Sequence, residues 1–284
     1  MTPTLISSSA KKYLPVLLVG VLLVILAAGY LMGYRPGPGL SVVHTGTLIV
    51  TGLPDASILY VDQEKQSTSG AAGFARMNLV PGSHTIIVAA PNAIPWEELV
   101  AIHSNQDTSV SPVLVPTELT QTPVETDKAP LARAVLQGDW LPTPASWLKL
   151  PCVDIYVENN RVLARVASTT GETSSASTSP KTPGCTPPPF LCESGTCAPT
   201  VVLAPRETVH GVIPFPGRSD TIIVAFGSSL IAIEIDPRNP QFFAPLLHGT
   251  TPYRIAPSDL SHILVSAGGN PVYLSFPVAS STKK

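Results

Sequence analysis

Four cysteines are the residues of this chain best suited to a chemical role. They are Cys152, Cys185, Cys192 and Cys197. An even number fits disulfides formed in an oxidising compartment, although four thiolates could also hold a tetrahedral zinc ion. The set lacks the paired C-x2-C spacing of zinc sites, and no histidine lies near the last three. We therefore favour disulfides over zinc, with a connectivity that the sequence does not specify.

Carboxylates occur in pairs, which is the arrangement that glycoside hydrolysis requires. Glu97 is followed directly by Glu98, and Asp62 is followed two residues later by Glu64. Neighbouring residues of a strand point to opposite faces, so Glu97 and Glu98 are not expected to act together. Asp62 and Glu64 lie where an expected strand enters a polar turn. We interpret both pairs as solvated residues at sheet edges.

The histidines and the other acids do not suggest a metal centre. The histidines occur singly, at His44, His84, His103, His210, His248 and His262. Asp220, Asp236 and Asp259 lie at the ends of expected strands, where we expect them to cap turns, because a calcium site needs about six converging oxygens. No nucleophile elbow, zinc-binding helix, P-loop or dinucleotide fingerprint occurs. We expect no enzyme activity, no cofactor and no metal.

Aromatic side chains are the remaining candidates for binding. Trp140, Trp147, Tyr156 and Phe190 lie in or near expected loops of the C-terminal half. Exposed aromatic rings often hold sugar rings or peptides on β modules. The alternative is that they cover the cores of small sheets, which have little other apolar material. The chain therefore has candidate binding residues but no catalytic set.

One long apolar run determines how these residues are displayed. Residues 13–34 contain no charged side chain, and a helix of that length spans about 33 Å, enough for a hydrocarbon core of about 30 Å. The sequence predicts a single transmembrane helix over 13–34. Lys11 and Lys12 precede it and Arg35 alone follows it, so the amino end is expected in the cytoplasm and the bulk outside.

The ends of the run favour an uncleaved signal-anchor in the cell membrane. Tyr13 and Tyr34 lie where the two membrane interfaces are expected, as aromatic anchors. The alternative is a cleaved signal peptide, because residues 27–29 (Ala-Ala-Gly) are small enough for a peptidase. Gly29 and Gly33 also form a small-xxx-small pair through which two such helices could form a homodimer.

Composition favours β structure outside the membrane. The 284 residues include 31 Pro and 20 Gly, and only 13% are charged, against about 25% in an average soluble domain. All 19 acidic residues and all but two of the 17 basic residues follow residue 34, which gives that part a net charge of −4. A mildly acidic surface without a basic block excludes nucleic acid as an expected partner.

The first expected β module shows a family resemblance. Its motifs are G-T-L-I-V-T-G-L-P-D-A-S-I-L-Y-V-D, N-L-V-P-G-S-H-T-I-I-V and I-P-W-E-E-L-V-A-I. The turn and strand-end positions are Pro54, Asp55, Ala56, Val61, Asp62, Pro81, Gly82 and His84. These residues resemble the PEGA domain, a small surface-associated β module of bacteria and archaea. P-D-A-S stands where the family has P-E-G-A, and Gln63 where glycine is common. The resemblance implies a small β-sandwich over residues 46–116.

The C-terminal half is expected to be a second β domain. A Thr- and Pro-rich segment, 117–137, is predicted to be a linker, and 138–277 a β-meander with a disordered Ser/Thr/Pro loop at 168–189. Asn159 and Asn160 are expected to form a hairpin turn. Residues 219–250 are similar to one blade of a β-propeller. A full ring needs at least four blades, and about nine strands are expected, so the ring should not close within the chain.

Taken together, the sequence predicts an all-β ectodomain on one transmembrane helix. Its parts are a tail at 1–12, the helix at 13–34, a spacer at 35–45, the two β modules with their linker, and a tail at 278–284. We expect a bacterial surface or envelope protein with a non-catalytic role that binds cell-wall polysaccharide or an envelope protein. The alternative is an accessory subunit of an envelope enzyme.

Overall fold

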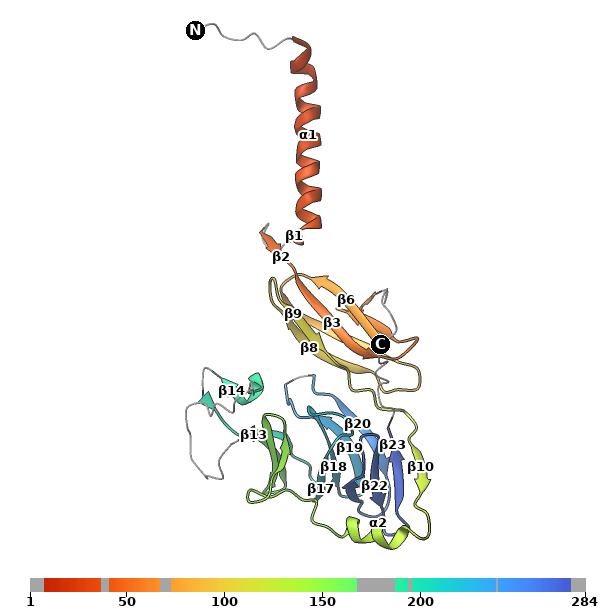
Figure 1. Ribbon diagram of the computed structural model, residues 1–284. Coiled ribbons are helices and arrows are strands. Elements are labelled where there is room, and N and C mark those ends of the chain that lie inside the picture. The colour runs from red at the N-terminus through yellow and green to blue at the C-terminus, as the bar shows by residue number, and fades with distance from the viewer. Residues whose placement is uncertain are drawn as a thin grey trace. The chain divides into compact units, whose positions relative to one another are not determined.

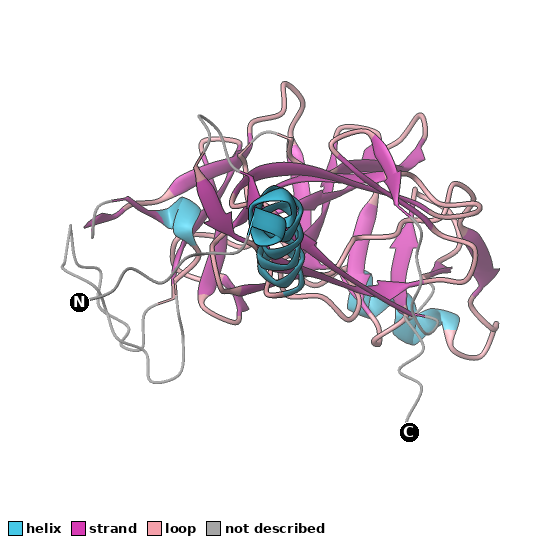
Figure 2. Cartoon of the chain, turned by 90° about the horizontal axis from the view of Figure 1, so that it is seen from above, coloured by secondary structure: helices cyan, strands magenta, loops and turns pink. Residues whose placement is uncertain are grey.

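The computed structural model describes residues 8–36, 41–66, 73–167, 187–193, 196–238 and 240–276. These residues form a mostly β protein with several antiparallel sheets, as expected (Figure 1). Strand and loop make up nearly all of it, and helix is confined to α1 and short pieces (Figure 2). The chain divides into two compact units, one comprising Met1–Thr51, Thr68–His84 and Val100–Ser111 and the other comprising Gly52–Ser67, Thr85–Leu99 and Pro112–Lys284.

The first unit begins with helix α1, Ser8–Leu31, which contains the expected apolar run up to Leu31. Its side chains are described from Pro15 onward. Large apolar side chains along the described part of the helix are exposed, from 50% for Val21 to 87% for Leu31. Within the described residues, no helix is long and apolar enough to meet the requirement for crossing a membrane. Lys11, Lys12 and Tyr13 lie in the part whose side chains are not described.

The helix ends earlier than predicted, because the chain turns at Gly33. This glycine has φ of +88°, a left-handed conformation that favours glycine, and it leads into β1, Tyr34–Pro36, which pairs with β2, Val42–His44. Gly29 and Gly33 therefore do not lie one turn apart on a continuous helix. The homodimer predicted from this pair remains untested.

Arg35 and Tyr34 contact the segment around this turn. The Arg35 guanidinium lies 3.4 Å from the centroid of the Tyr30 ring and donates to the Tyr30 carbonyl at 2.7 Å. Tyr34 packs edge-on against His44, with centroids 4.9 Å apart. Tyr34, which was predicted to lie at a membrane interface, and Arg35 are thus both held in contacts near the carboxyl end of α1.

The first unit also contains a three-stranded sheet in the order β6-β3-β9. Its strands are β3 (Gly46–Leu53), β6 (Gly73–Leu79) and β9 (Asp107–Val110). β3 and β9 pair in parallel, with Thr47 opposite Asp107. Alternate residues of β3 are fully buried, including Leu48 and Val50, as the period of two in a strand requires.

A four-stranded sheet, β5-β4-β7-β8, lies largely in the second unit. Its strands are β4 (Ile58–Val61), β5 (Glu64–Gln66), β7 (Gly82–Ala89) and β8 (Trp96–Ile102). The hairpin between β4 and β5 turns at Asp62 and Gln63, both with positive φ (50° and 69°). Asp62 Oδ1 accepts a hydrogen bond from the Thr85 amide at 3.0 Å, so Asp62 is a turn residue.

Three further four-stranded antiparallel sheets follow in the second unit. The first, β11-β12-β13-β16, comprises Leu148–Leu150, Val153–Glu158, Arg161–Val166 and Thr200–Leu203. The second, β17-β18-β19-β20, comprises Val209–Pro214, Thr221–Phe226, Ser229–Glu234 and Phe243–His248. The third, β10-β23-β22-β21, comprises Thr120–Pro123, Val272–Ser275, His262–Ser266 and Arg254–Pro257. The second sheet has the meander order that was predicted for one blade.

Sequence alternation explains the core between the first two of these sheets. Val153 and Ile155 on β12 and Ile231 and Ile233 on β19 are at most 2% exposed and belong to one apolar cluster. The predicted hairpin at Asn159 and Asn160 is confirmed, with φ of 50° and 60°. The Asn160 side chain also bonds to the Pro205 and Glu207 carbonyls and the Val209 amide, which ties the hairpin to β17.

The predicted linker at 117–137 contains regular structure. β10 pairs with β23, the last described strand, with Thr120 opposite Ser275. Helix α2, Ala129–Leu136, buries Ala132 and Leu136 against Ala256 and Leu264. The composition was misleading for β10, because this strand is exposed at all four positions and needs only backbone pairing. This strand completes a four-stranded sheet with β23, β22 and β21.

Candidate binding site

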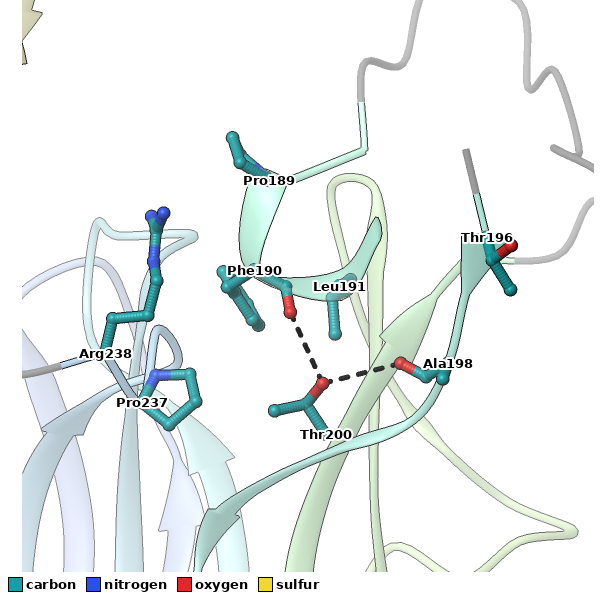
Figure 3. A pocket seen from close by; sticks show the side chains of 8 residues that line it. All are labelled: Pro189, Phe190, Leu191, Thr196, Ala198, Thr200, Pro237 and Arg238. Atoms are coloured by element: carbon teal, nitrogen blue, oxygen red, sulfur yellow. Dashed lines mark hydrogen bonds between the residues drawn. The ribbon is translucent and has the colours of Figure 1, made fainter. Parts of the chain in front are cut away.

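A hollow of about 620 Å³ lies beside the disulfide-bonded segment of the second unit (Figure 3). We call it the Phe190 hollow. It is lined by Pro189, Phe190, Leu191, Thr196, Ala198, Thr200, Pro237 and Arg238. Five of these side chains are apolar, two carry hydroxyl groups and one is a cation. Such a mixture is typical of sites in which apolar contact supplies binding and one charge fixes orientation.

A short 3₁₀ helix, Pro189–Leu191, forms one wall of the Phe190 hollow. Leu191 is 2% exposed and anchors this turn in the core, while Phe190 is half-buried and packs against the same core. The Thr200 hydroxyl lies 3.4 Å from the Phe190 carbonyl and 3.5 Å from the Ala198 carbonyl (Figure 3). The wall therefore rests on backbone that is held at several points.

The cysteines reinforce this wall. Cys192 and Cys197 form a disulfide across the strands β14, Cys192–Glu193, and β15, Thr196–Cys197. Cys152 is also disulfide-bonded. Cys185 lies outside the described residues. The preference for disulfides over zinc is confirmed for the Cys192–Cys197 pair.

Arg238 supplies the charge of the Phe190 hollow. Its guanidinium binds the Asp236 carboxylate, with Nε 2.9 Å from Oδ1, and Asp236 Oδ1 also accepts the Arg238 amide at 3.1 Å. Asp236 thus caps a turn, as predicted, and also orients the cation. These hydrogen bonds raise the pKa of Arg238, so its charge is fixed at every accessible pH.

The four candidate aromatic residues separate into different environments. Trp140 and Trp147 line a second hollow of about 410 Å³, and Phe190 lines the Phe190 hollow. Tyr156 is only 8% exposed, and burial raises the pKa of its hydroxyl. The Arg165 guanidinium carbon lies 3.1 Å from the Trp147 centroid and 5.7 Å from that of Tyr156. Tyr156 is therefore a covered residue and no binding platform.

The sequence did not predict that two carboxyls, Glu98 and Glu234, belong to one partly buried place. Trp96 Nε1, on β8, donates to Glu234 Oε1, on β19, at 2.8 Å, although the two residues are far apart in the chain, and Glu98 lies on the same face of β8 as Trp96. Burial first, and then nearby carboxylates, raise the pKa of Glu98 to about 7, while burial is the main cause that raises the pKa of Glu234. The only sequence signal was an acid, Glu234, among isoleucines on a buried strand.

A serine, a histidine and an aspartate also meet near one turn. Ser261 Oγ and Asp259 Oδ1 both lie 2.8 Å from the same nitrogen, Nδ1, of His262. A catalytic triad uses the two different ring nitrogens for its serine and its acid, so this group is not arranged as a triad. Asp259 also accepts the Ser261 amide at 2.7 Å, and these bonds lower its pKa to about 2. It caps the turn, as predicted.

Among the described residues, no three histidine, cysteine or acidic side chains are grouped so that they could hold a metal ion. Comparisons of the sequence with models of known protein families and with characterised proteins find no match. The hollows and the buried carboxyls are therefore the features from which a function can be inferred.

Proposed function

We propose that this protein is a membrane-anchored, extracytoplasmic binding protein that holds a segment of a protein partner in the Phe190 hollow. The observation that carries the proposal is the combination of an apolar wall, Pro189 and Phe190, with one fixed cation, Arg238. A peptide with an apolar side chain next to a carboxylate matches both features. PEGA-like motifs in residues 46–116 support a role at a bacterial surface.

A cell-wall polysaccharide is the rival ligand. Sugar sites usually offer an exposed aromatic face together with several hydrogen-bonding groups. In the Phe190 hollow, the Phe190 ring is half-buried against the core, and five of the eight lining side chains are apolar. The accessory-subunit alternative differs only in the identity of the partner, and the same hollow would serve it.

Peptide selection tests the ligand class. Peptides selected from a random displayed library on the full chain in detergent should pair an apolar residue with Asp or Glu. Phe190→Ala should weaken their binding by about 10- to 100-fold, because an aromatic anchor in a pocket carries much of the binding energy. Arg238→Gln should remove the preference for the acid. Calorimetry measures the affinity of the selected peptides for the wild-type chain and for each variant.

Phe243→Ala is the matched control for the hollow. Phe243 is 49% exposed on β20 and does not line the hollow, so its loss should leave the affinity unchanged. Equal weakening by Phe190→Ala and Phe243→Ala would contradict the site. Retention of the full chain on purified cell-wall sacculi, with no peptide selected, would favour the polysaccharide instead.

The membrane anchor has separate support. Val16, Leu17, Leu18 and Val19 are consecutive in α1 and each is at least 56% exposed. Four consecutive helical positions point in all directions around the axis, so apolar surface surrounds this part of the helix. Lipid is the solvent that suits such a surface. A helix packed against a protein core would have at least one buried face.

Membrane extraction tests the anchor. The full chain expressed in a bacterium should stay in the membrane pellet after alkaline carbonate washing. Replacing Leu22 and Leu23 together by arginine should release most of it, because each buried charge costs about 2.5–3.5 kcal/mol at the centre of a span. Leu131→Arg, at a 70% exposed position of α2, should not change the distribution. Release of the unaltered chain by carbonate would contradict an integral anchor.

A further inference from the structure

Strand β8 meets the sheet β17-β18-β19-β20 through one face of its first residues. Trp96 and Glu98 are two residues apart and so lie on the same face of the strand, whereas Glu97 lies on the opposite, exposed face. Trp96 is 1% exposed, and its indole N–H reaches Glu234, which is 9% exposed, across 138 residues of sequence. We call Trp96, Glu98 and Glu234 the β8 clasp.

The charges around the β8 clasp are unbalanced. The charged groups that act electrostatically on Glu98 are Glu234, Asp220, Asp236 and Arg238, and Arg218 also acts on Glu234. Both arginines already have carboxylate partners. Arg218 binds Asp220 at 2.8 and 2.6 Å and donates to the Pro112 carbonyl at 3.0 Å, while Arg238 binds Asp236.

Among the residues that the structure describes, neither Glu98 nor Glu234 therefore has a cation of its own. Ionising both in a partly buried place costs energy through desolvation and through repulsion of like charges. A single proton on one of them removes most of that cost. The Trp96 N–H, 2.8 Å from Glu234 Oε1, favours the charged form of Glu234, and we therefore assign the proton to Glu98.

We propose that the β8 clasp is a proton-dependent device, which holds β8 against the β17-β18-β19-β20 sheet while Glu98 is protonated and loosens when Glu98 ionises. Ionisation would also place a new negative charge near Arg238, which lines the Phe190 hollow. The device therefore connects external pH with both the packing of β8 and the charge of the hollow. Its operation does not require that the hollow binds a peptide.

The direction of the pH effect follows from the two states of Glu98. Its pKa in the folded chain is about 7, above the ordinary 4.5 expected when the chain unfolds. The folded state thus binds the proton more tightly, and the stabilisation is complete below about pH 4.5. It decreases as pH rises and is lost above about pH 7.

Melting temperatures of the full chain in detergent test this proposal. Between pH 5 and pH 8 we expect the wild-type melting temperature to fall by about 3–6 °C. Glu98→Gln keeps a neutral side chain of the same size, so most of that slope should disappear. Glu97→Gln is the matched control and should keep the wild-type slope. The proposal is overturned if Glu98→Gln and wild type have equal slopes, or if Glu97→Gln also loses the slope.

Hydrogen exchange of the unaltered chain provides a second measurement if Glu98→Gln does not fold. Amides of β8 should exchange at least about threefold faster at pH 8 than at pH 6 after correction for the intrinsic rate, because the clasp opens more often. Amides of β12 serve as the internal reference and should not change. Equal corrected rates for β8 at the two pH values would overturn the proposal.

Discussion

Replacing Trp96 by alanine is expected to destabilise the second unit by about 3–5 kcal/mol, the usual cost of removing a fully buried tryptophan. Trp96 is 1% exposed, so the cavity left behind would be large. The substitution also deletes the N–H that Glu234 accepts at 2.8 Å. Because that N–H lowers the pKa of Glu234, its loss should drive the carboxyl towards its protonated form. Urea unfolding followed by circular dichroism measures the change.

Trp96→Phe separates the two contributions. It keeps most of the ring volume but removes the hydrogen-bond donor, and should cost about 1–3 kcal/mol, the penalty for leaving a buried polar group without its partner. Leu99→Ala, at a position that is 50% exposed on the same strand, should stay within about 0.5 kcal/mol of wild type. If Trp96→Phe is as stable as wild type, the bond to Glu234 contributes nothing to the fold.

The local parts of the fold were predictable because they depend on residues close together in sequence. The alternation of Ile231 and Ile233 specifies a buried strand face, and Asn159-Asn160 specifies a hairpin turn because asparagine tolerates positive φ. Asp236 and Asp259 were predictable as turn caps, because each accepts the backbone amide of a residue only two positions later. In each case the physical cause lies within a few residues of the effect.

The features that the sequence did not predict depend on residues that are far apart in the chain. β10 has an exposed, Thr-rich sequence, and it is a strand only because the last described strand, β23, offers an edge to it. Glu98 was interpreted as a solvated acid, because the sequence does not reveal that Glu234 on β19 acts on it electrostatically. Similarly, the Phe190 hollow requires Arg238 to meet a segment nearly fifty residues earlier. Sequence periodicity contains no information on contacts between such distant segments.

A methyl group added at Gly46 is expected to destabilise the first unit by about 3 kcal/mol, the upper part of the usual range for overpacking. A Cβ atom at this position would lie 2.2 Å from the His103 carbonyl oxygen and 2.7 Å from Ile102 Cγ2. The first of these atoms belongs to the backbone and cannot rotate away. The turn after β8 would have to move, and with it the Gln106 carbonyl that accepts the Thr47 amide at 2.9 Å.

That displacement has a specific signature, because the Thr47–Gln106 bond lies at the start of the parallel pairing between β3 and β9. In Gly46→Ala, the Thr47 amide should exchange with solvent much faster than in wild type, in addition to the loss of stability in urea. Gly269→Ala is the control, since a Cβ there meets open space and should change stability by less than about 0.5 kcal/mol. Wild-type exchange at Thr47 in Gly46→Ala would mean that the turn is not held against β3. Faster exchange confined to this amide and its neighbours would instead indicate that glycine at position 46 is what allows β9 to pair in parallel with β3.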